Sequence, residues 1–570
     1  MKNKLVVDIF RNIAEILEIK GENVFRIRAY QKAADTIEGL AEDIENFVSQ
    51  GRLRDIPGIG ADLSAKIKEI VAAGKLEFYE ELKKNIPEGL LELLTIPSVG
   101  PRTAGLLFDK LKVKSIRDLE NAIAKGMLEG IPGIKEKTIV NILKGIELIK
   151  RVKERMPLAV ARRLAEDFLG SLRKIKEVNV IFPAGSLRRC RETVRDIDIL
   201  VVSDKPGKVM DVFTSLEQIK EVLVKGETKS SVRSYDDVQI DCRVVEEKSF
   251  GAALMYFTGS KNFNIRIRQL AQKKGWKINE YGVFSSDGKY LAGRTEEEIF
   301  KLFKMQFIDP ELRENSGEFE LALENKLPKL IKLEDIRGDL HCHSNYSDGG
   351  NSIEEMALAA RKKGYAYIAL TDHSQSLKIA GGMSIESLSK KKKEIVRLNR
   401  QWNDFRIFYG AEVDIDSQGG IDYPDSVLKE FDIVVAAIHA GFRQSSEQLT
   451  KRIVRACQNK FVHIISHPTG RLWGVRDSYE LNLEEVFKTA KETNTALEIN
   501  SFPQRLDLNG QNSRFAKKMG VKLAVNTDSH AIEHLDNISL GICVARSGWL
   551  EAGDVINTLT LDKLLRTIKK

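Results

Sequence analysis

The sequence predicts a multidomain protein with an all-α N-terminal region, an α+β middle region and a C-terminal distorted α/β barrel. Three observations support this division. Gly- and Pro-containing turns repeat along the first 150 residues, strand-like apolar runs begin near residue 178, and all eight histidines lie between residues 341 and 534. At roughly 100–200 residues per domain, a chain of 570 residues has room for about three to five domains.

The composition excludes several classes of protein. No run of about 18 apolar residues occurs, so no membrane contact is expected, and the first residues lack the apolar core of a signal peptide. The five cysteines form no CxxC pair, which favours a reducing cytoplasm and disfavours a disulfide framework. Residues 101–200 hold 22 Lys and Arg against 13 Asp and Glu. Such a surplus is typical of a nucleic-acid surface and predicts association with the nucleoid, although a solvated basic face has the same pattern.

Three turns in residues 1–150 resemble one another: IPGIG, IPSVG and IPGIK, within residues 53–70, 93–110 and 128–145. Each is followed by a predicted helix. Gly58, Gly60 and Gly100 allow a tight turn, and the free N–H groups at the start of the next helix suit a DNA backbone phosphate. Lys135 replaces the second glycine of the third turn, which makes phosphate binding there weaker.

Two aspartates in DIDILVV, Asp196 and Asp198, are two apart on a predicted strand and therefore face the same side. Asp241, on another predicted strand, completes a set suited to Mg²⁺. Upstream, Gly185 and Ser186 offer a turn and a hydroxyl. Arg188 and Arg189 offer donors for a triphosphate. Two metal ions with a phosphate clamp are the requirements for phosphoryl transfer.

These residues, GSLRR, DIDIL and QIDCR, resemble the nucleotidyltransferase core of the family X DNA polymerases, the DNA polymerase beta type. The segments AYQKAADTIEGL, YFTGSKNFNIRIR and INEYGVF extend the resemblance over about residues 1–310. It implies a helical DNA-binding domain with helix-hairpin-helix motifs at 1–150 and a polymerase core with its nucleotide-binding subdomain at 151–310.

The resemblance also implies roles for individual residues. Asp196, Asp198 and Asp241 would bind two Mg²⁺ ions, with Asp241 helping to activate the primer 3′-hydroxyl. The incoming dNTP would be held through one set of residues: Gly185, Ser186, Arg189, Tyr256, Phe257, Gly259, Asn264 and Arg268. Tyr256 would act against a ribose 2′-hydroxyl, and Asn264 and Arg268 would touch the nascent base pair.

Two positions depart from the family pattern. Gln239 stands where relatives often have an arginine, so this position is expected to help catalysis less than it does in those relatives. Lys66 aligns with the Schiff-base lysine of relatives that remove a 5′-deoxyribose phosphate, but Asp62 replaces a phosphate-binding lysine of those relatives. A nearby carboxylate favours the charged, unreactive amine, so an ordinary helix lysine is the favoured interpretation of Lys66.

A metal site is predicted in the last third of the chain, after a linker at 311–336. His341 and His343 share one side of a strand, and Asp528 and His530 repeat that spacing. The full candidate set is His341, His343, Asp348, His373, Glu412, His439, His467, Asp528 and His530. Most of these follow predicted strands, where barrel-like folds build active sites. Imidazole with carboxylate suits two or three Zn²⁺ or Mn²⁺ ions. We expect His463, His534 and Cys342 to be ordinary structural residues.

This set resembles the PHP (polymerase and histidinol phosphatase) domain over about residues 337–570. The resemblance implies a distorted, TIM-like α/β barrel with a trinuclear metal site that hydrolyses phosphate esters. The chain as a whole is then expected to be a monomer that fills short gaps in gapped or primed DNA, as in base-excision repair. Its PHP domain would act as a 3′–5′ exonuclease, with nicking of abasic sites a further option.

Alternatives remain open from the sequence. The PHP domain could be a small-molecule phosphatase tethered to a polymerase, or a metal-stabilised scaffold without activity. The whole chain could be a DNA-binding factor with little catalysis, which the intact aspartate set disfavours. Template-independent nucleotide addition is not excluded.

Overall fold

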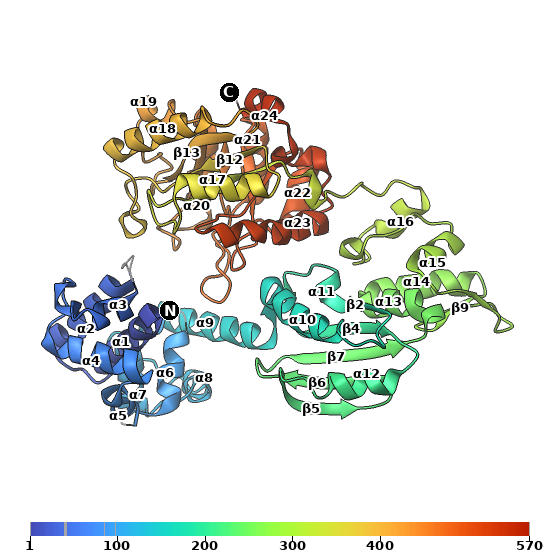
Figure 1. Ribbon diagram of the computed structural model, residues 1–570, viewed down its shortest axis with the longest axis horizontal. Coiled ribbons are helices and arrows are strands. Elements are labelled where there is room, and N and C mark those ends of the chain that lie inside the picture. Colours follow the sequence, from blue (N-terminus) through green and yellow to red (C-terminus); the bar gives the residue numbers. More distant parts are fainter. Residues whose placement is uncertain (1, 39–42, 85, 97, 569–570) are drawn as a thin grey trace. The chain divides into compact units, whose positions relative to one another are not determined.

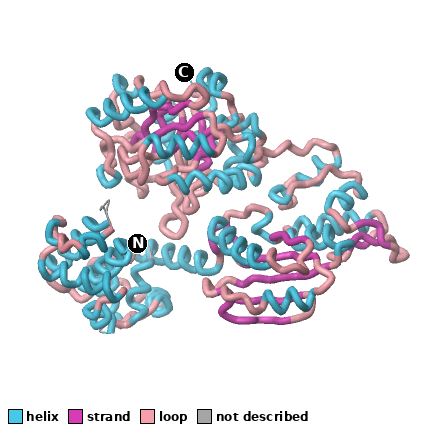
Figure 2. The backbone as a smooth tube through the Cα atoms, in the orientation of Figure 1, coloured by secondary structure: helices cyan, strands magenta, loops and turns pink. Residues whose placement is uncertain are grey.

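The structure is a computed structural model that describes residues 2–38, 43–84, 86–96 and 98–568. The chain divides into two compact units, Met1–Lys153 and Glu154–Lys570. Figure 1 labels their elements and Figure 2 colours them by type. Among the described residues, no helix combines the length and apolar character that a membrane span requires.

The described part of the first unit is helical, with short 3-10 turns and no strand (Figure 2). Helix α1 buries a stripe that includes Phe10, Ile13 and Leu17, the spacing expected of an amphipathic helix. The helices are α1 Lys2–Ile19, α2 Val24–Glu38, α3 Ile44–Ser49, α4 Ala61–Ala73, α5 Glu77–Lys84, α6 Glu88–Glu92, α7 Pro101–Leu111, α8 Ile116–Ala124 and α9 Glu136–Glu154.

The three repeated turns share one backbone conformation. Gly58, Ser98 and Gly133 occupy equivalent positions and have φ values of 87°, 85° and 91°. Gly60 and Gly100 are the N-cap residues of α4 and α7, and neither helix start has a side-chain cap. The first N–H groups of both helices are thus without a side-chain acceptor. Pro97 of the second turn lies outside the described residues.

The second unit begins with a five-stranded mixed sheet in the order β2-β4-β7-β6-β5. Alternation along β4 turns Ile197 and Ile199 toward a core packed by α10 and α12 and leaves Asp196 and Asp198 on the opposite face. The elements are β1 Met156–Pro157, α10 Leu158–Leu172, β2 Val180–Pro183, α11 Gly185–Arg188, β3 Thr193–Val194, β4 Asp196–Val202, α12 Pro206–Phe213, β5 Ile219–Lys225, β6 Lys229–Ser234 and β7 Gln239–Val245.

A smaller α/β subdomain follows the sheet and has its own apolar core, which includes Phe263, Phe300 and Phe319. Helix α13 also packs through Ala253 and Leu254 against Leu200 of β4. The subdomain contains α13 Phe250–Thr258, α14 Lys261–Lys273, β8 Lys277–Asn279, β9 Gly282–Phe284, β10 Tyr290–Ala292, α15 Glu296–Leu302 and α16 Glu318–Leu323.

From residue 338 seven parallel strands run in sequence order, β11 to β17. The strands are buried along their length, as expected where helices cover a parallel sheet. Cys342 pairs with Ser529 beyond the end of β17, and His343 N donates to Ser529 O at 2.8 Å. The sheet thus nearly closes on itself, which confirms the predicted distorted barrel (Figure 2).

The barrel elements alternate as a βα fold requires. They are β11 Gly338–Cys342, α17 Ile353–Lys362, β12 Tyr367–Leu370, α18 Ile385–Asn399, β13 Arg406–Asp414, α19 Asp425–Leu428, β14 Ile433–Ala437, α20 Ser446–Gln458, β15 Ile464–Ile465, α21 Leu483–Glu492, β16 Ala496–Asn500, α22 Gly510–Met519, β17 Leu523–Asn526, α23 Ile538–Ser547 and α24 Leu561–Ile568.

One cysteine prediction is wrong. Cys190, just after α11, forms a disulfide with Cys543 of α23, with Cα atoms 5.4 Å apart. The two cysteines are 353 residues apart in sequence, so no local spacing could have revealed the pair. Cys242, Cys342 and Cys457 are buried and outside any disulfide, so Cys342 is the core residue expected. One continuous buried apolar cluster includes both Cys190 and Cys543, together with residues of the five-stranded sheet and of the barrel.

Candidate active sites

The three predicted aspartates meet at one end of two neighbouring strands. Strands β4 and β7 are parallel, and their register places Asp198 directly opposite Asp241, with Asp196 opposite Gln239. Gln239 Nε2 donates to Asp241 Oδ1 at 3.1 Å. Three carboxylates so close repel one another unless a cation lies between them. This donor set fits Mg²⁺, which prefers carboxylate oxygens and leaves positions for water and phosphate.

Electrostatics support that fit. Burial, followed by the charges of Asp196 and Asp241, raises the pKa of Asp198 to about 7. The neighbouring Arg243 and Arg189 lower the pKa only in part. A divalent cation would stabilise the charged form of Asp198.

Gly185 lies against Asp198 in a way that no other residue could. Its φ is +61°, and a β-carbon there would lie 2.2 Å from Asp198 Oδ2. The glycine begins the short helix α11, so the Gly185–Ser186 turn approaches the carboxylates closely. The sequence requirement for glycine here is therefore both conformational and steric.

A cavity of about 520 Å³ opens beside these carboxylates. It is lined by all eight residues of the predicted nucleotide-binding set: Gly185, Ser186, Arg189, Tyr256, Phe257, Gly259, Asn264 and Arg268. Asn264 Nδ2 donates to the backbone oxygen of Tyr256 at 2.7 Å, and the Arg268 guanidinium lies 5.2 Å from the Tyr256 ring centroid. Asp196 and Asp198 line the same cavity, so a triphosphate in it would reach the carboxylates.

Arg188, predicted to offer donors to a triphosphate, is not among the residues that line this cavity. Its guanidinium makes two hydrogen bonds to Glu296, at 2.9 and 2.6 Å, and a third to Thr258. Arg313, fully buried, bonds the same carboxylate at 2.5 Å. Burial opposes ionisation of Glu296, but the charges of Arg313 and Arg188 prevail and lower its pKa to about 2. Arg188 thus ties α11 to α15, and its neighbour Arg189 remains in the cavity.

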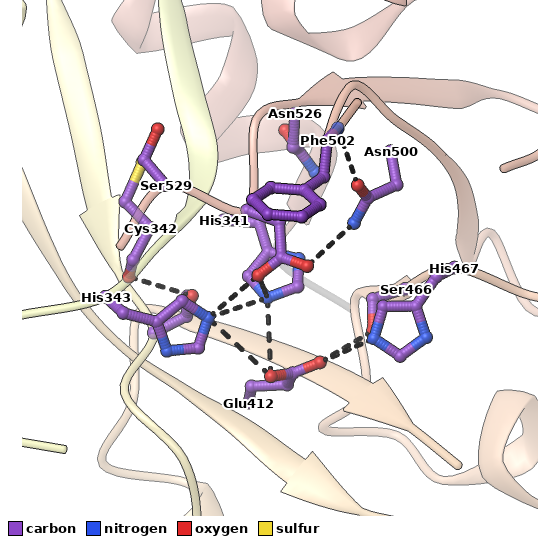
Figure 3. Close-up of polar contacts among 12 residues, drawn as sticks. His341, Cys342, His343, Glu412, Ser466, His467, Asn500, Phe502, Asn526 and Ser529 are labelled. Carbon is purple, nitrogen blue, oxygen red and sulfur yellow. Dashed lines mark hydrogen bonds and ion pairs between the residues drawn. The ribbon is translucent and has the colours of Figure 1, made fainter. Parts of the chain in front are cut away.

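The second site lies where the barrel strands end. His341 lies on β11 and His343 directly follows it, Glu412 lies on β13, and His467 follows β15. In Figure 3 the rings of the three histidines surround the Glu412 carboxylate. His467 Nε2 lies 3.1 Å from Glu412 Oε1, and His343 Nε2 lies 3.2 Å from His341 Nε2. The strand ends thus bring together residues that are more than 120 positions apart in the chain.

Eight of the nine predicted ligands fall into three overlapping groups whose donor atoms lie within 4.8 Å of one another. The groups share His343 and His373, and His467 joins through Glu412. They are His343, Asp348, His373 and His530; His341, His343 and Asp528; and His373, Glu412 and His439. Three groups with shared members have the arrangement of a cluster of two or three ions.

Buried polar atoms in this cluster are without hydrogen-bond partners. They include Nδ1 of His343, Nδ1 of His373, and Oε2 of Glu412. His373 Nδ1 and Glu412 Oε2 lie 2.9 Å apart, yet they do not form a hydrogen bond. With the His373 ring deprotonated, the two atoms are electron-pair donors whose separation fits adjacent positions around one cation. A bound transition metal would take the place of the ring proton.

The pKa values of two histidines in the cluster are shifted far from the ordinary value, in opposite directions. Burial and the neighbouring His530 and His373 lower the pKa of His343 to about 3, which keeps the ring neutral and able to bind a metal. Burial disfavours the charged form of His373, but the carboxylates of Glu412 and Asp348 outweigh it and raise its pKa to about 10.

Several supporting residues were not identified from the sequence. Glu498, fully buried, lies 2.8 Å from His341 Nδ1 through Oε1. Asp414 contacts His439 Nδ1 in the same way. Carboxylates on the second ring nitrogen fix the orientation of a ligating histidine. Both could have been found, because Asp414 is two residues after Glu412 and Glu498 lies on the predicted strand ALEIN, each polar among apolar neighbours.

Other polar residues complete the site. Arg505 Nε lies 3.3 Å from Asp528 Oδ2. In the described part of the chain, Arg505 is the one arginine or lysine that forms an ion pair with a carboxylate of the three groups. Lys391, fully buried, pairs with Asp372 at 2.7 Å beside His373. His463 Nδ1 and His534 Nδ1 each accept a backbone N–H and stand outside the three groups.

Lys66 of the first unit is not an isolated amine. It forms an ion pair with Asp62 one helical turn earlier, and its Nζ lies 5.2 Å from the Phe78 ring centroid. Its side chain is 15% exposed, less than expected of an ordinary helix lysine. The amine is thus held by a carboxylate and lies near an aromatic ring.

Comparisons with known families match four segments. The helix-hairpin-helix domain matches residues 1–76, and the SAM-like helix-hairpin-helix tandem matches 90–147. The DNA polymerase beta thumb matches 253–314, and the PHP domain matches 339–502. All three predicted architectures therefore have a family counterpart.

Similar proteins agree with these matches. The chain is 39% identical over 573 residues to "DNA polymerase/3′-5′ exonuclease PolX" of Bacillus subtilis, covering 100% of both chains. It is 34% identical over 202 residues to a "Probable phosphatase" of Caldicellulosiruptor bescii, covering 34% of this chain and 79% of that protein. It is 24% identical over 332 residues to "DNA polymerase lambda" of Rattus norvegicus, covering 53% and 54%. The full-length match and the order of the domains show that this chain belongs to the PolX family, the family X DNA polymerases that carry a C-terminal PHP domain.

Proposed function

We propose that residues 151–310 catalyse template-directed addition of dNTPs to a DNA primer, with Mg²⁺ bound by Asp196, Asp198 and Asp241. The observation that carries this proposal is the β4–β7 register, which sets Asp198 against Asp241 at the edge of the 520 Å³ cavity. Bound Mg²⁺ would neutralise triphosphate charge and lower the pKa of the attacking hydroxyl.

The protein's own groups then position the reactants. Arg189 and the Ser186 hydroxyl would hold the triphosphate, and the Tyr256 side chain would lie beside the sugar. Gln239 Nε2 donates to Asp241 Oδ1, so we assign the other oxygen, Oδ2, to the primer 3′-hydroxyl. Arg268 packs on the ring of Tyr256 and would contact the base pair being formed.

The PHP domain is proposed to hydrolyse DNA phosphodiesters from the 3′ end, with Zn²⁺ or Mn²⁺ in the three groups of ligands. Bound ions would supply a hydroxide nucleophile and polarise the phosphate. Glu498 and Asp414 would hold His341 and His439 in ligating orientation, and Arg505 would bind a phosphate oxygen. Cleavage at abasic sites is part of this proposal because it breaks the same kind of bond.

The name of the Bacillus subtilis relative includes a 3′–5′ exonuclease, which supports this assignment. A small-molecule phosphatase is the second candidate, because the Caldicellulosiruptor bescii relative, which matches 34% of this chain, is named a probable phosphatase. Hydrolysis of histidinol phosphate without degradation of a single-stranded primer would favour the second candidate.

The N-terminal hairpins are proposed to grip DNA backbone phosphates through the helix starts after Gly60 and Gly100. Gly58 allows the first turn its left-handed conformation. The proposed domains are residues 1–150, 151–310 and 337–570, and residues 311–336 connect the second to the third. We propose that the protein acts as a monomer that fills short gaps in DNA. We assign this gap filling to base-excision repair.

One experiment separates the two sites. A duplex with a single-nucleotide gap is incubated with dNTPs and Mg²⁺ or Mn²⁺, using wild type, Asp198→Ala and His341→Ala. Asp198→Ala should lose extension and keep degradation, and His341→Ala should do the reverse. Normal primer degradation by His341→Ala would overturn the nuclease assignment.

A further inference from the structure

Cys190 and Cys543 meet where the five-stranded sheet domain contacts the barrel. Cys190 follows Arg189, which lines the nucleotide cavity, and Cys543 lies on α23. Their Cα separation of 5.4 Å is within the range that a disulfide spans without backbone movement. Both residues are buried, with 6% and 5% of their surface exposed.

A guanidinium lies over the two sulfurs. Arg162 Nη2 is 2.6 Å from Cys543 Sγ and 3.7 Å from Cys190 Sγ. No carboxylate lies within ion-pair distance of Arg162 in the described part of the chain, whereas Arg546 nearby is paired with Asp309 and Glu311. A guanidinium beside a thiol favours the thiolate, which is the reactive form.

The sulfurs are also reachable. A cavity of about 670 Å³ is lined by Cys190, Cys543, Arg162 and Arg163. This volume is in the range of pockets that admit small molecules. A buried thiol pair, an activating cation and an access route therefore coincide, and neither proposed active site uses any of them.

We propose that Cys190 and Cys543 form a peroxide-sensitive thiol–disulfide site that joins the five-stranded sheet domain covalently to the barrel. The Cys543 thiolate attacks hydrogen peroxide and becomes a sulfenic acid, releasing hydroxide. The Cys190 thiol then displaces that hydroxyl as water and forms the S–S bond. In sum, two thiols and one peroxide give one disulfide and two waters, and a thiol reductant reverses the change.

The test counts thiols in the full-length protein after denaturation. The sequence holds five cysteines, so reduced wild type should give five thiols and peroxide-treated wild type 5 − 2 = 3, with a mass loss of about 2 Da. Peptide mapping should join the Cys190 peptide to the Cys543 peptide. Cys190→Ser should form no disulfide, and the control Cys457→Ser should still lose two thiols. Five thiols in treated wild type, or a linkage to another cysteine, would overturn the proposal.

Arg162 gives a second, kinetic test. Arg162→Gln should slow disulfide formation at pH 7 by about tenfold, the effect of about one pKa unit on the thiolate fraction. Arg163→Gln, at the exposed neighbouring position on the same cavity, should react at the wild-type rate. Equal rates for the two variants would remove Arg162 from the mechanism. Neither readout depends on polymerase or nuclease activity.

Discussion

Gly185 and Asp198 approach so closely that a β-carbon on residue 185 would lie 2.2 Å from Asp198 Oδ2. Gly185→Ala should therefore displace the carboxylate and strain the left-handed backbone at φ +61°. Since a displacement of about 1 Å can cost about 100-fold in rate, we expect kcat/KM for primer extension to fall by at least about that factor. Primer degradation should be unchanged. Gly207→Ala is the control, because a β-carbon there meets nothing within 4 Å, and near-normal extension by Gly185→Ala would contradict the proposed geometry.

Glu498→Gln should weaken the barrel's metal site. The Glu498 carboxylate contacts the His341 ring and accepts hydrogen bonds from Asn500 and Asn526. A glutamine amide has only one acceptor oxygen, and its NH₂ group would meet one of these donors. Loss of such a partner typically costs about 10–100-fold in metal affinity or activity. Metal content by mass spectrometry and primer degradation should both fall, while extension persists. The exposed Glu492→Gln should behave as wild type, and full metal content in Glu498→Gln would refute the orienting role.

The Glu296 network should stabilise the fold in a pH-dependent way. The folded-state pKa of about 2 is below the ordinary 4.5, so the contribution is present above about pH 4.5 and is lost as pH falls toward 2. Glu296→Gln should destabilise the second unit by about 3 kcal/mol at pH 7, because Arg313 is left buried and unpaired. The difference in urea midpoint from wild type should shrink between pH 5 and pH 2. Glu297→Gln, exposed on the same helix, should show no such difference at any pH.

Lys66 should not act as a Schiff-base nucleophile while it is paired with Asp62. Borohydride trapping on a 5′-deoxyribose phosphate end should give no adduct, or an adduct that Lys66→Ala does not diminish. Gel mobility of the labelled DNA measures this directly. An adduct in wild type that disappears in Lys66→Ala would instead establish the lyase.

The sequence predicted the architecture well because its signals are local. Alternation set Asp196 and Asp198 on one face. His341 in β11 and His343 just after it have the same spacing, so the strand period alone predicted shared faces. The distorted barrel was predicted from short apolar strands that alternate with helical stretches and from the resemblance to the PHP domain. The comparisons and the structure confirm that part.

What the sequence did not reveal depends on contacts between distant segments. Arg188 and Arg189 are adjacent and chemically identical, but Arg188 is paired with Glu296, 108 residues later, whereas Arg189 is paired with Glu314 and lines the nucleotide cavity. The Cys190–Cys543 pair spans 353 residues. Glu498 stands out as a polar residue in an apolar strand, but its partner, His341, lies 157 residues earlier in the chain. Pairings of this kind are set by tertiary packing, which no local pattern encodes.

The buried apolar cluster that contains both Cys190 and Cys543 has a practical consequence. A shortened protein ending near residue 336 would uncover side chains that now face the barrel, and Arg546 would no longer hold Asp309 and Glu311. Loss of polymerisation in such a truncation would then report insolubility and not chemistry. Because the two modules share this buried cluster, their separate activities should be assigned by single substitutions within the intact protein.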